Sequence, residues 1–153
     1  MSKQAEFPDN TTYPFWTRES IRNADTDQFG HVNNAAIASY CEAGRMALFS
    51  EQCLQEAVAG LNVVVVKLTI QFEQELFYPG DVRVGTRVTA VGNTSFQVSQ
   101  GLYGVGGRFA TSEATCVMMD RAQHKPIHVP DVVRALFAQI TKGPVSRDGI
   151  LQN

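Results

Sequence analysis

The sequence predicts an α+β domain in which an antiparallel sheet of about five strands packs against one long helix. Apolar residues recur at helical spacing over residues 34–51, as they do on the buried face of a helix. Four later runs, between residues 61 and 122, have the composition of strands and are joined mainly by short turns. Helices and strands do not alternate along the chain, which argues against a doubly wound parallel sheet.

Residues 13–23 mix aromatic side chains with alternating polarity and predict a first strand that leads into a polar loop. The pattern becomes helical at Asn34, and either Asn33 or Asn34 is suited to cap the helix. The alanines of this helix make its surface small, so that a sheet is expected to approach it closely. The residues of its predicted buried face are Ile37, Tyr40, Cys41, Gly44 and Leu48.

A short helical turn is expected over residues 53–60, followed by four strands. The first, residues 61–77, is rich in β-branched side chains and alternates in polarity in its second half. Turns are indicated by YPGD at 78–81, by GN at 92–93 and by the glycines at 106–107. Asp131 is suited to cap a last helix over residues 132–140. All of this forms one domain, with residues 1–12 and 141–153 expected to be loosely held.

Composition excludes several classes of protein. With 153 residues, a net charge of −2 and no basic patch, the chain is not expected to bind nucleic acid. Its three cysteines show no CxxC spacing, which argues against a disulfide framework and a zinc site, and no cofactor is expected. No apolar run reaches 18 residues, so no membrane span is predicted. The N-terminus lacks the apolar core of a signal peptide, and a cytoplasmic location is therefore expected.

The string 25-DTDQFGHVNN-34, followed by Tyr40 and by ExxR at 42–45, concentrates polar groups immediately before the helix. Taken residue by residue, these side chains also fit a capped turn, in which Asp and Asn accept hydrogen bonds from the free N–H groups of a helix start. Taken as a whole, the string resembles the active-site segment of the hotdog-fold acyl-CoA thioesterases, specifically the 4-hydroxybenzoyl-CoA thioesterase family. The long strand after the helix, the PGD turn and the GNTSF turn are similar to the layout of that family.

The resemblance implies a hotdog fold, in which the antiparallel sheet wraps around one long central helix and a short C-terminal helix follows. It implies hydrolysis of an acyl-CoA thioester in a homodimer or homotetramer whose active sites lie at the subunit junction. The catalytic carboxylate of the family falls on Asp27 and its tight turn on Gly30. The backbone N–H group that stabilises the oxyanion falls at about Asn34, and His31 and Asn33 match residues that line the pocket.

In some members of the family, basic residues in the turn before the fourth strand hold the CoA phosphates. Here that turn contains Thr94 and Ser95 but neither lysine nor arginine. Both residues are candidates for substrate binding, whereas the phosphates need basic groups from elsewhere. The alternatives for this role are Arg87, Arg108, Arg121 and Lys125, which fit solvated surface charges at least as well. A second hotdog type carries its catalytic glutamate within the helix, where Glu42 lies in this chain, but an ion pair on the helix is the favoured role for Glu42.

The chemistry requires a site for negative charge and a group that attacks the carbonyl. A helix start supplies the first, because its free N–H groups carry about half a positive charge. Asp27 supplies the second, because an aspartate with a pKa near 3.9 is ionised at neutral pH. It acts either as a nucleophile or as a general base, and the sequence does not separate the two. Asp25 is expected to serve the loop instead.

Two rival functions remain. A hotdog dehydratase or hydratase pairs an acid with a histidine, and Asp27 and His31 are both present, but the D-x-N-x-x-H string of those enzymes is not matched. A non-catalytic acyl-CoA sensor would not need an acid beside the thioester.

Residues 63–70, VVVVKLTI, are expected to form an edge strand. Such an edge is an aggregation hazard unless it is covered, which predicts pairing with a second copy.

Overall fold

The computed structural model describes residues 13–142, so the predictions for residues 1–12 and 143–153 lie outside the described part. Its helices are α1 (Asn34–Ser50), α2 (Gln52–Ala57) and α3 (Asp131–Lys142), and a short 3₁₀ turn, η1, covers Asn23–Asp25. The strands are β1 (Phe15–Ser20), β2 (Leu61–Phe72), β3 (Asp81–Val91), β4 (Ser95–Gly104), β5 (Gly107–Asp120) and the two-residue β6 (Lys125–Pro126).

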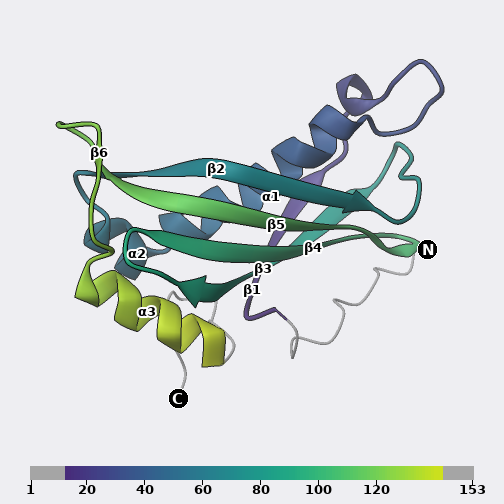
Figure 1. The fold of residues 1–153 in the computed structure, drawn as a ribbon. Helices are drawn as coiled ribbons and strands as arrows, with labels where there is room; N and C mark the ends of the chain where they lie inside the picture. Colours follow the sequence, from purple (N-terminus) through teal and green to yellow (C-terminus); the bar gives the residue numbers. More distant parts are fainter. Residues whose placement is uncertain (1–12, 143–153) are drawn as a thin grey trace.

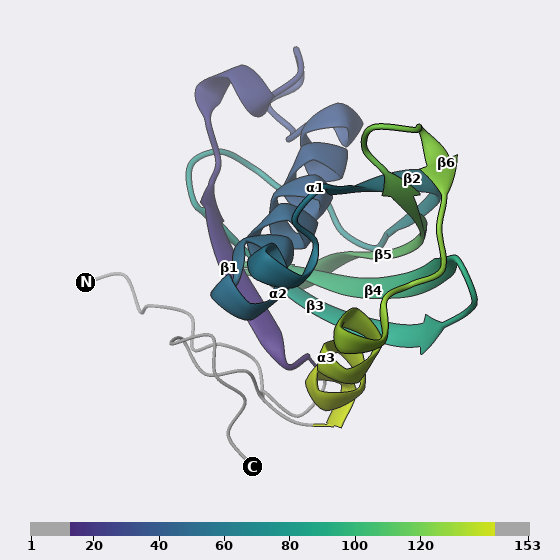
Figure 2. The ribbon, with the colours of Figure 1, turned by 90° about the vertical axis from the view of Figure 1, so that its left-hand side faces the viewer.

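The strands form one antiparallel sheet in the order β1-β3-β4-β5-β2, with β6 paired to β5. The sheet curls around α1, as Figures 1 and 2 show from two directions, while α3 covers one end of the same concave face. This arrangement confirms the predicted fold class. Strand β2 lies at an edge of the sheet, as expected from its place in the chain.

Helix α1 begins where the sequence predicts. Asn33 is the N-cap, and its side-chain oxygen accepts a hydrogen bond of 2.8 Å from the Ala36 N–H. The helix packs mainly against β1 and β3. Gly44 faces the sheet, and a Cβ atom at this position would lie 2.7 Å from both Val84 Cγ1 and Gln100 Nε2. The small surface of the helix therefore permits the close approach that the sequence suggests.

This contact predicts that Gly44→Ala destabilises the protein by about 1–3 kcal/mol, because overpacking in a tight core forces neighbouring groups to move. The loss is expected even though alanine is intrinsically better than glycine in a helix by about 1 kcal/mol. Urea unfolding measures the difference. The control is Ser39→Ala, on the exposed side of α1, which should change stability by less than about 0.5 kcal/mol. A Gly44→Ala protein more stable than wild type would contradict the close approach.

The core of the described chain consists of two apolar clusters separated by polar side chains. One cluster lies around the first half of α1 and includes Ile37, Tyr40 and Phe109. The other lies around its second half and α3 and includes Leu48, Phe96 and Phe137. Between the two clusters, α1, β3, β4 and β5 each place one polar side chain in the interior. These residues, which we call the polar belt, are Arg45, Thr86, Gln100 and Ser112.

Three predicted boundaries differ from the structure. The first strand ends at Ser20, because the chain then turns into η1, where the Asp25 carboxylate accepts the Arg22 N–H. The last helix includes Asp131 and continues to Lys142.

The third difference concerns the predicted strand over residues 61–77, which ends at Phe72. The N–H groups of Glu73 and Gln74 still donate to Phe109 O of β5, and the chain then pairs with the loop before α1. The Val32 N–H donates to Leu76 O over 2.7 Å, and His31 forms an isolated bridge with Phe77. No helix in the described part of the chain is long and apolar enough to cross a bilayer.

Candidate active site

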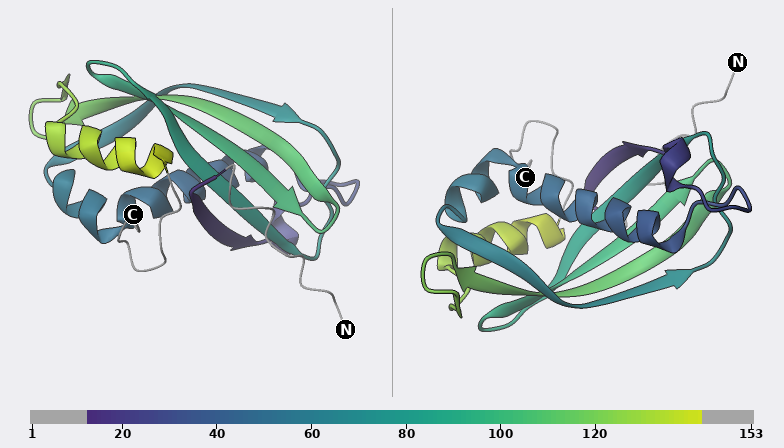
Figure 3. Two further views of the ribbon diagram at one scale, coloured as in Figure 1. Left: turned by 90° about the horizontal axis from the view of Figure 1, so that it is seen from below. Right: turned by 90° about the horizontal axis from the view of Figure 1, so that it is seen from above.

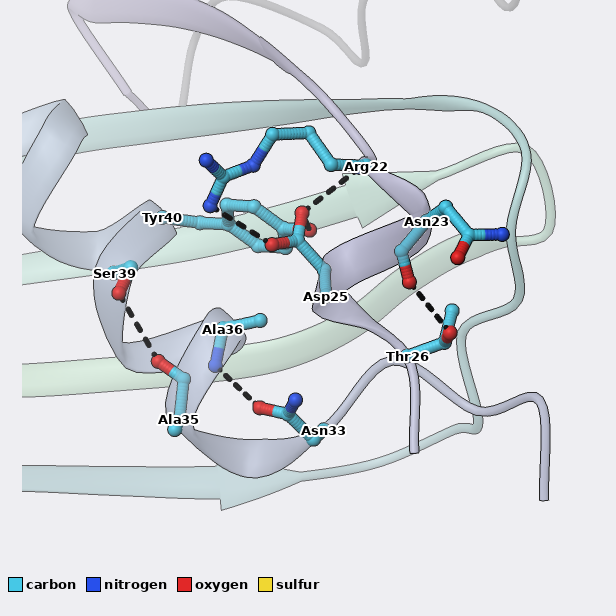
Figure 4. Close-up of polar contacts among 9 residues, drawn as sticks. All are labelled: Arg22, Asn23, Asp25, Thr26, Asn33, Ala35, Ala36, Ser39 and Tyr40. Atoms are coloured by element: carbon cyan, nitrogen blue, oxygen red, sulfur yellow. Dashed lines mark hydrogen bonds and ion pairs between the residues drawn. The ribbon is translucent and has the colours of Figure 1, made fainter. Parts of the chain in front are cut away.

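The loop before α1 is anchored by Asp25, whose side chain is only 4% exposed. Its carboxylate accepts hydrogen bonds from the Arg22 N–H (2.9 Å), the Arg22 guanidinium (3.0 Å) and the Tyr40 hydroxyl (2.7 Å), as Figure 4 shows. Its backbone oxygen also accepts the Asn33 N–H, directly before the helix. The prediction that Asp25 serves the loop is therefore confirmed.

These contacts determine the ionisation of the buried groups. Burial raises the pKa of the Asp25 carboxyl, but the hydrogen bonds from Arg22 and Tyr40 together outweigh this effect, and the pKa lies below its usual value. Burial and the hydrogen bond to Asp25 both raise the pKa of the Tyr40 hydroxyl. Asp25 is thus an ionised structural carboxylate, with no acidic proton available for catalysis at neutral pH.

Asp27 lies in a different environment, exposed at the tip of the same loop. Its Oδ1 accepts the N–H groups of Phe29 (2.8 Å) and His31 (3.1 Å). The Gly30 N–H donates to Asp27 O over 3.1 Å, and Gly30 has a φ of 81°, a left-handed conformation that glycine adopts without strain. Oδ2 of Asp27 makes no hydrogen bond within the described part of the chain, so this oxygen is available to an incoming group.

The N-terminus of α1 has two unused donors. Because Asn33 caps the helix through the Ala36 N–H and its carbonyl accepts the Ile37 N–H, the backbone N–H groups of Asn34 and Ala35 have no acceptor among the described residues. Such groups attract negative charge at a helix start. The Asn34 N–H is thus unused at the position where the resemblance implies the oxyanion donor, and that role stays a prediction.

A cleft of about 330 Å³ joins these features. One wall comes from the loop and the start of α1, and includes Asp27, His31 and Asn34. The other comes from the end of β2 and the segment that follows it, and consists of Phe72, Glu73, Gln74, Glu75 and Leu76. This second wall was not predicted, because residues 73–77 were assigned to a strand. The cluster of polar residues in 73-EQE-75, where the alternation stops, is the signal that could have indicated a loop.

Aromatic side chains lie in the cleft wall and on the segments that form it. The His31 ring packs edge-on against Phe77, with ring centroids 4.9 Å apart, and its Nε2 lies 3.6 Å from Glu75 Oε1. Phe29, Phe72 and Phe77 are all about half exposed or more. Tyr40, by contrast, belongs to the core. The surroundings of the cleft therefore combine apolar surface with carboxylates.

Other predicted site residues lie elsewhere. The side chain of Asn33 is used by the helix cap and does not line the cleft. Thr94 and Ser95 lie in the β3–β4 hairpin, at the end of the sheet that α3 covers, where the Thr94 carbonyl accepts the Met118 N–H. The described chain does not bring this hairpin to the cleft, and roles for these three residues in substrate binding stay predictions.

Among the basic candidates for phosphate binding, Arg108 is joined to the cleft through an ion pair of 2.9 Å with Glu73. Arg121 donates to Leu61 O and Asn62 Oδ1, and Arg87 lies over the Tyr13 ring. Glu42, the alternative carboxylate on α1, is exposed and does not line the cleft. Within the described residues, no group of three or more His, Cys, Asp or Glu side chains is arranged to hold a metal ion.

Comparison with known proteins identifies the family of the chain. Residues 21–137 match the family model described as the thioesterase-like superfamily. The chloroplastic acyl-acyl carrier protein thioesterase ATL2 of Arabidopsis thaliana is 30% identical over 122 residues, which cover 76% of this chain and 64% of that protein. Its relative ATL3 is 24% identical over 127 residues, covering 80% of this chain and 66% of ATL3. The chain thus spans slightly less than two thirds of the length of these curated relatives.

Two solved structures show the same architecture. A predicted thioesterase from Bacillus stearothermophilus is 25% identical, with a TM-score of 0.76 over 85% of this chain and 98% of that one. A thioesterase from Thermus thermophilus, complexed with coenzyme A and zinc, is 24% identical, with a TM-score of 0.75 over 86% of this chain and 98% of that one. The curled sheet around a central helix is the hotdog fold, and the chain belongs to the thioesterase-like superfamily.

Proposed function

We propose that this chain hydrolyses acyl thioesters in the cleft beside the N-terminus of α1. The observation that carries the proposal is the pairing of two features in one cleft. Asp27 offers an oxygen with no hydrogen bond inside the described chain, and the helix start offers the unused N–H of Asn34. The first suits attack on a carbonyl carbon and the second suits the charge that develops on the carbonyl oxygen.

In the proposed reaction, the thioester carbonyl oxygen accepts a hydrogen bond from the Asn34 N–H, assisted by the positive end of the helix dipole. Asp27 Oδ2 either attacks the carbonyl carbon to give a mixed anhydride that water then hydrolyses, or removes a proton from a water molecule that attacks. In both routes the C–S bond breaks and the thiol of the carrier leaves. Oδ1 meanwhile keeps its hydrogen bonds to Phe29 and His31, so the turn stays fixed.

The proposed substrate is an acyl-CoA. Structures related in fold bind coenzyme A, and the Arabidopsis relatives act on acyl groups carried by acyl carrier protein. Both carriers present the thioester on a flexible arm, so the acyl carrier protein thioester is the alternative substrate. Exposed aromatic side chains beside the cleft suit an apolar acyl group, and Phe72 contributes to its wall. Arg108 forms an ion pair with Glu73, which lines the cleft, and Arg108 is therefore the basic residue that we propose for carrier binding.

A panel of short, medium, long-chain and aryl acyl-CoAs, with the same acyl groups on acyl carrier protein, tests the proposal by measuring free thiol. Turnover of at least one thioester well above the rate without enzyme is expected. Binding of the panel without thiol release would instead support the sensor. No turnover and no binding across both carriers would contradict the proposed function.

The arrangement of His31 disfavours the hydratase alternative. That chemistry needs an acid and an imidazole that act together, but Asp27 bonds to the backbone N–H of His31, and not to its ring. The ring packs against Phe77 and lies close to Glu75. The same samples test this alternative, because hydration of an enoyl-CoA changes its ultraviolet absorbance without releasing thiol.

We also propose that the chain forms a homodimer or a dimer of such dimers through β2. This strand is an edge of the sheet, and its inward-pointing Val65, Leu68 and Phe72 are 37%, 37% and 48% exposed. A second copy paired antiparallel to β2 would cover both the strand edge and these side chains. We expect a dimer or tetramer by sedimentation, weakened roughly tenfold or more by Leu68→Lys, because the interface would bury a charge. A stable, active wild-type monomer at working concentration would rule the assembly out.

A further inference from the structure

Arg45 is a buried cation without an anion. Its side chain is 5% exposed, and its Nη1 donates to the neutral Gln100 Oε1 over 3.3 Å. Its Nε is enclosed and has no hydrogen-bond partner, and no carboxylate of the described residues lies within ion-pair distance. Arginine stays protonated in proteins, and an unpaired buried charge costs several kcal/mol. Such a group calls for an anion from outside the described chain.

The contacts of the polar belt locate Arg45 relative to the edge strand β2, and so indicate where an anion could reach it. Gln100, which contacts Arg45, pairs with Ser112 in the sheet, and Ser112 pairs with Ile70 of β2. The Arg45 charge also acts on the thiol of Cys116, which lies opposite Val65 of β2. Arg45 therefore lies level with residues 65–70, near the middle of β2. The view from above in Figure 3 shows α1 lying across the concave face, with β2 along one edge of the sheet.

Glu42 presents the opposite situation on the same helix. It lies at the midpoint of α1, one turn before Arg45, and its side chain is exposed. Despite the i,i+3 spacing, the two residues form no ion pair, and Glu42 has no other ion-pair partner in the described part of the chain. Helix α1 thus carries an exposed carboxylate, Glu42, and a buried guanidinium, Arg45, and neither forms an ion pair within the described residues.

We propose that Glu42 of a second copy supplies the anion for Arg45, and that the reverse pair forms at the same time. The inference rests on the proposed homodimer through β2. Antiparallel self-pairing with full overlap places the two-fold axis near the middle of β2, which is the level of Arg45. The same axis relates the two α1 helices in antiparallel orientation, and we place their crossing point between Glu42 and Arg45. Each Arg45 then faces the Glu42 of the other copy.

The catalytic cleft is a poorer source of this anion. Its lining reaches Ile37 on α1 but does not include Arg45, which lies two turns further along the helix. Asp27, Glu73 and Glu75 line the cleft, so a negatively charged acyl group would enter against carboxylates.

A double-mutant cycle tests the pair. Glu42→Gln, Arg45→Met and the double variant are compared with wild type by sedimentation over a dilution series, which gives the dimer dissociation constant. Removing one partner of a buried charge pair typically costs 2–5 kcal/mol, so each single change should weaken the dimer by roughly 30-fold or more. The double variant should lose much less than the product of the two single losses. Glu42→Lys, at an exposed site that requires no core repacking, should weaken the dimer further.

The ion pair between Arg18 and Asp81, on β1 and β3 at the far side of the sheet from β2, provides the matched control. Arg18→Met and Asp81→Asn should leave the dissociation constant unchanged. Additive effects in the cycle, a Glu42→Lys dimer as tight as wild type, or a monomeric wild type would each overturn the inference. The inference would also be overturned if Arg45→Met left association intact but raised KM for acyl groups that end in a carboxylate. In that case the substrate carboxylate, and not Glu42, would be the anion that pairs with Arg45.

Thiol release, measured on the same samples, keeps the two proposals apart. A wild-type protein that shows coupling between Glu42 and Arg45 but releases no thiol from any substrate supports this inference and contradicts only the proposed function.

Discussion

Asp27→Asn is expected to lower turnover of the best thioester by roughly 10²–10⁴, the usual range for a positioned acid–base group. The change removes the negative charge from Oδ2 but keeps an oxygen that accepts the N–H groups of Phe29 and His31. Because the site is exposed and the replacement nearly isosteric, the fold and the oligomeric state should survive. Steady-state kinetics beside thermal melting of the variant separates loss of chemistry from loss of structure.

Two carboxylates serve as controls for this experiment. Glu75 lines the same cleft and is exposed near His31, so Glu75→Gln should lower turnover less than about tenfold if Asp27 carries the chemistry. Asp25→Asn should reduce stability more than turnover, because that side chain is buried in hydrogen bonds. Near-wild-type turnover of Asp27→Asn, or complete loss in a well-folded Asp25→Asn protein, would show that the wrong carboxylate has been assigned.

Asp25→Asn should lower the free energy of unfolding by about 2–4 kcal/mol, because hydrogen bonds to a charged group contribute about 1.5–3 kcal/mol each. The amide cannot accept from the Arg22 N–H, the Arg22 guanidinium and the Tyr40 hydroxyl as the carboxylate does. Urea unfolding measures the loss. Tyr40→Phe removes one of these donors, and its effect should not add fully to that of Asp25→Asn. Additive effects would contradict a shared network.

This carboxylate also gives stability a dependence on pH. Because the pKa of Asp25 is lower in the folded protein than its ordinary value of 3.8, its contribution is complete above that value. The contribution is lost as the pH falls through the folded-state pKa. The difference in melting temperature between wild type and Asp25→Asn should therefore be constant above about pH 5 and shrink below about pH 4. A difference that grows on acidification would contradict the depressed pKa.

The sequence by itself determined the local structure around the site. Helical spacing from Ile37 to Leu48 defined α1, and Asn33 was one of two predicted caps because its side chain reaches the N–H of the residue three positions on. Gly30 marked a turn because few other residues adopt its positive φ. These features depend on groups only a few residues apart in the chain, so their physical causes can be read from the sequence.

Only the tertiary structure shows the features that depend on contacts between residues far apart in the sequence. Residues 73–77 were predicted to continue β2, but at Leu76 and Phe77 the backbone bonds instead to the loop before α1, more than 40 residues earlier in the chain. The second wall of the cleft follows from that contact. The structural role of Asp25 was expected, but its cause became visible only when the Tyr40 hydroxyl was found to donate to the buried carboxylate.

The burial of Arg45 is a second feature that only the tertiary structure shows. In the sequence it is one member of an ExxR pair on a helix, where an ion pair with Glu42 is the ordinary expectation. Only the packed sheet shows that its guanidinium lies inside, against Gln100, while Glu42 lies outside. The apolar pattern of α1 predicted its buried face, but the burial of a charged side chain beside that face depends on which strands cover it, so the pattern did not specify the burial of Arg45.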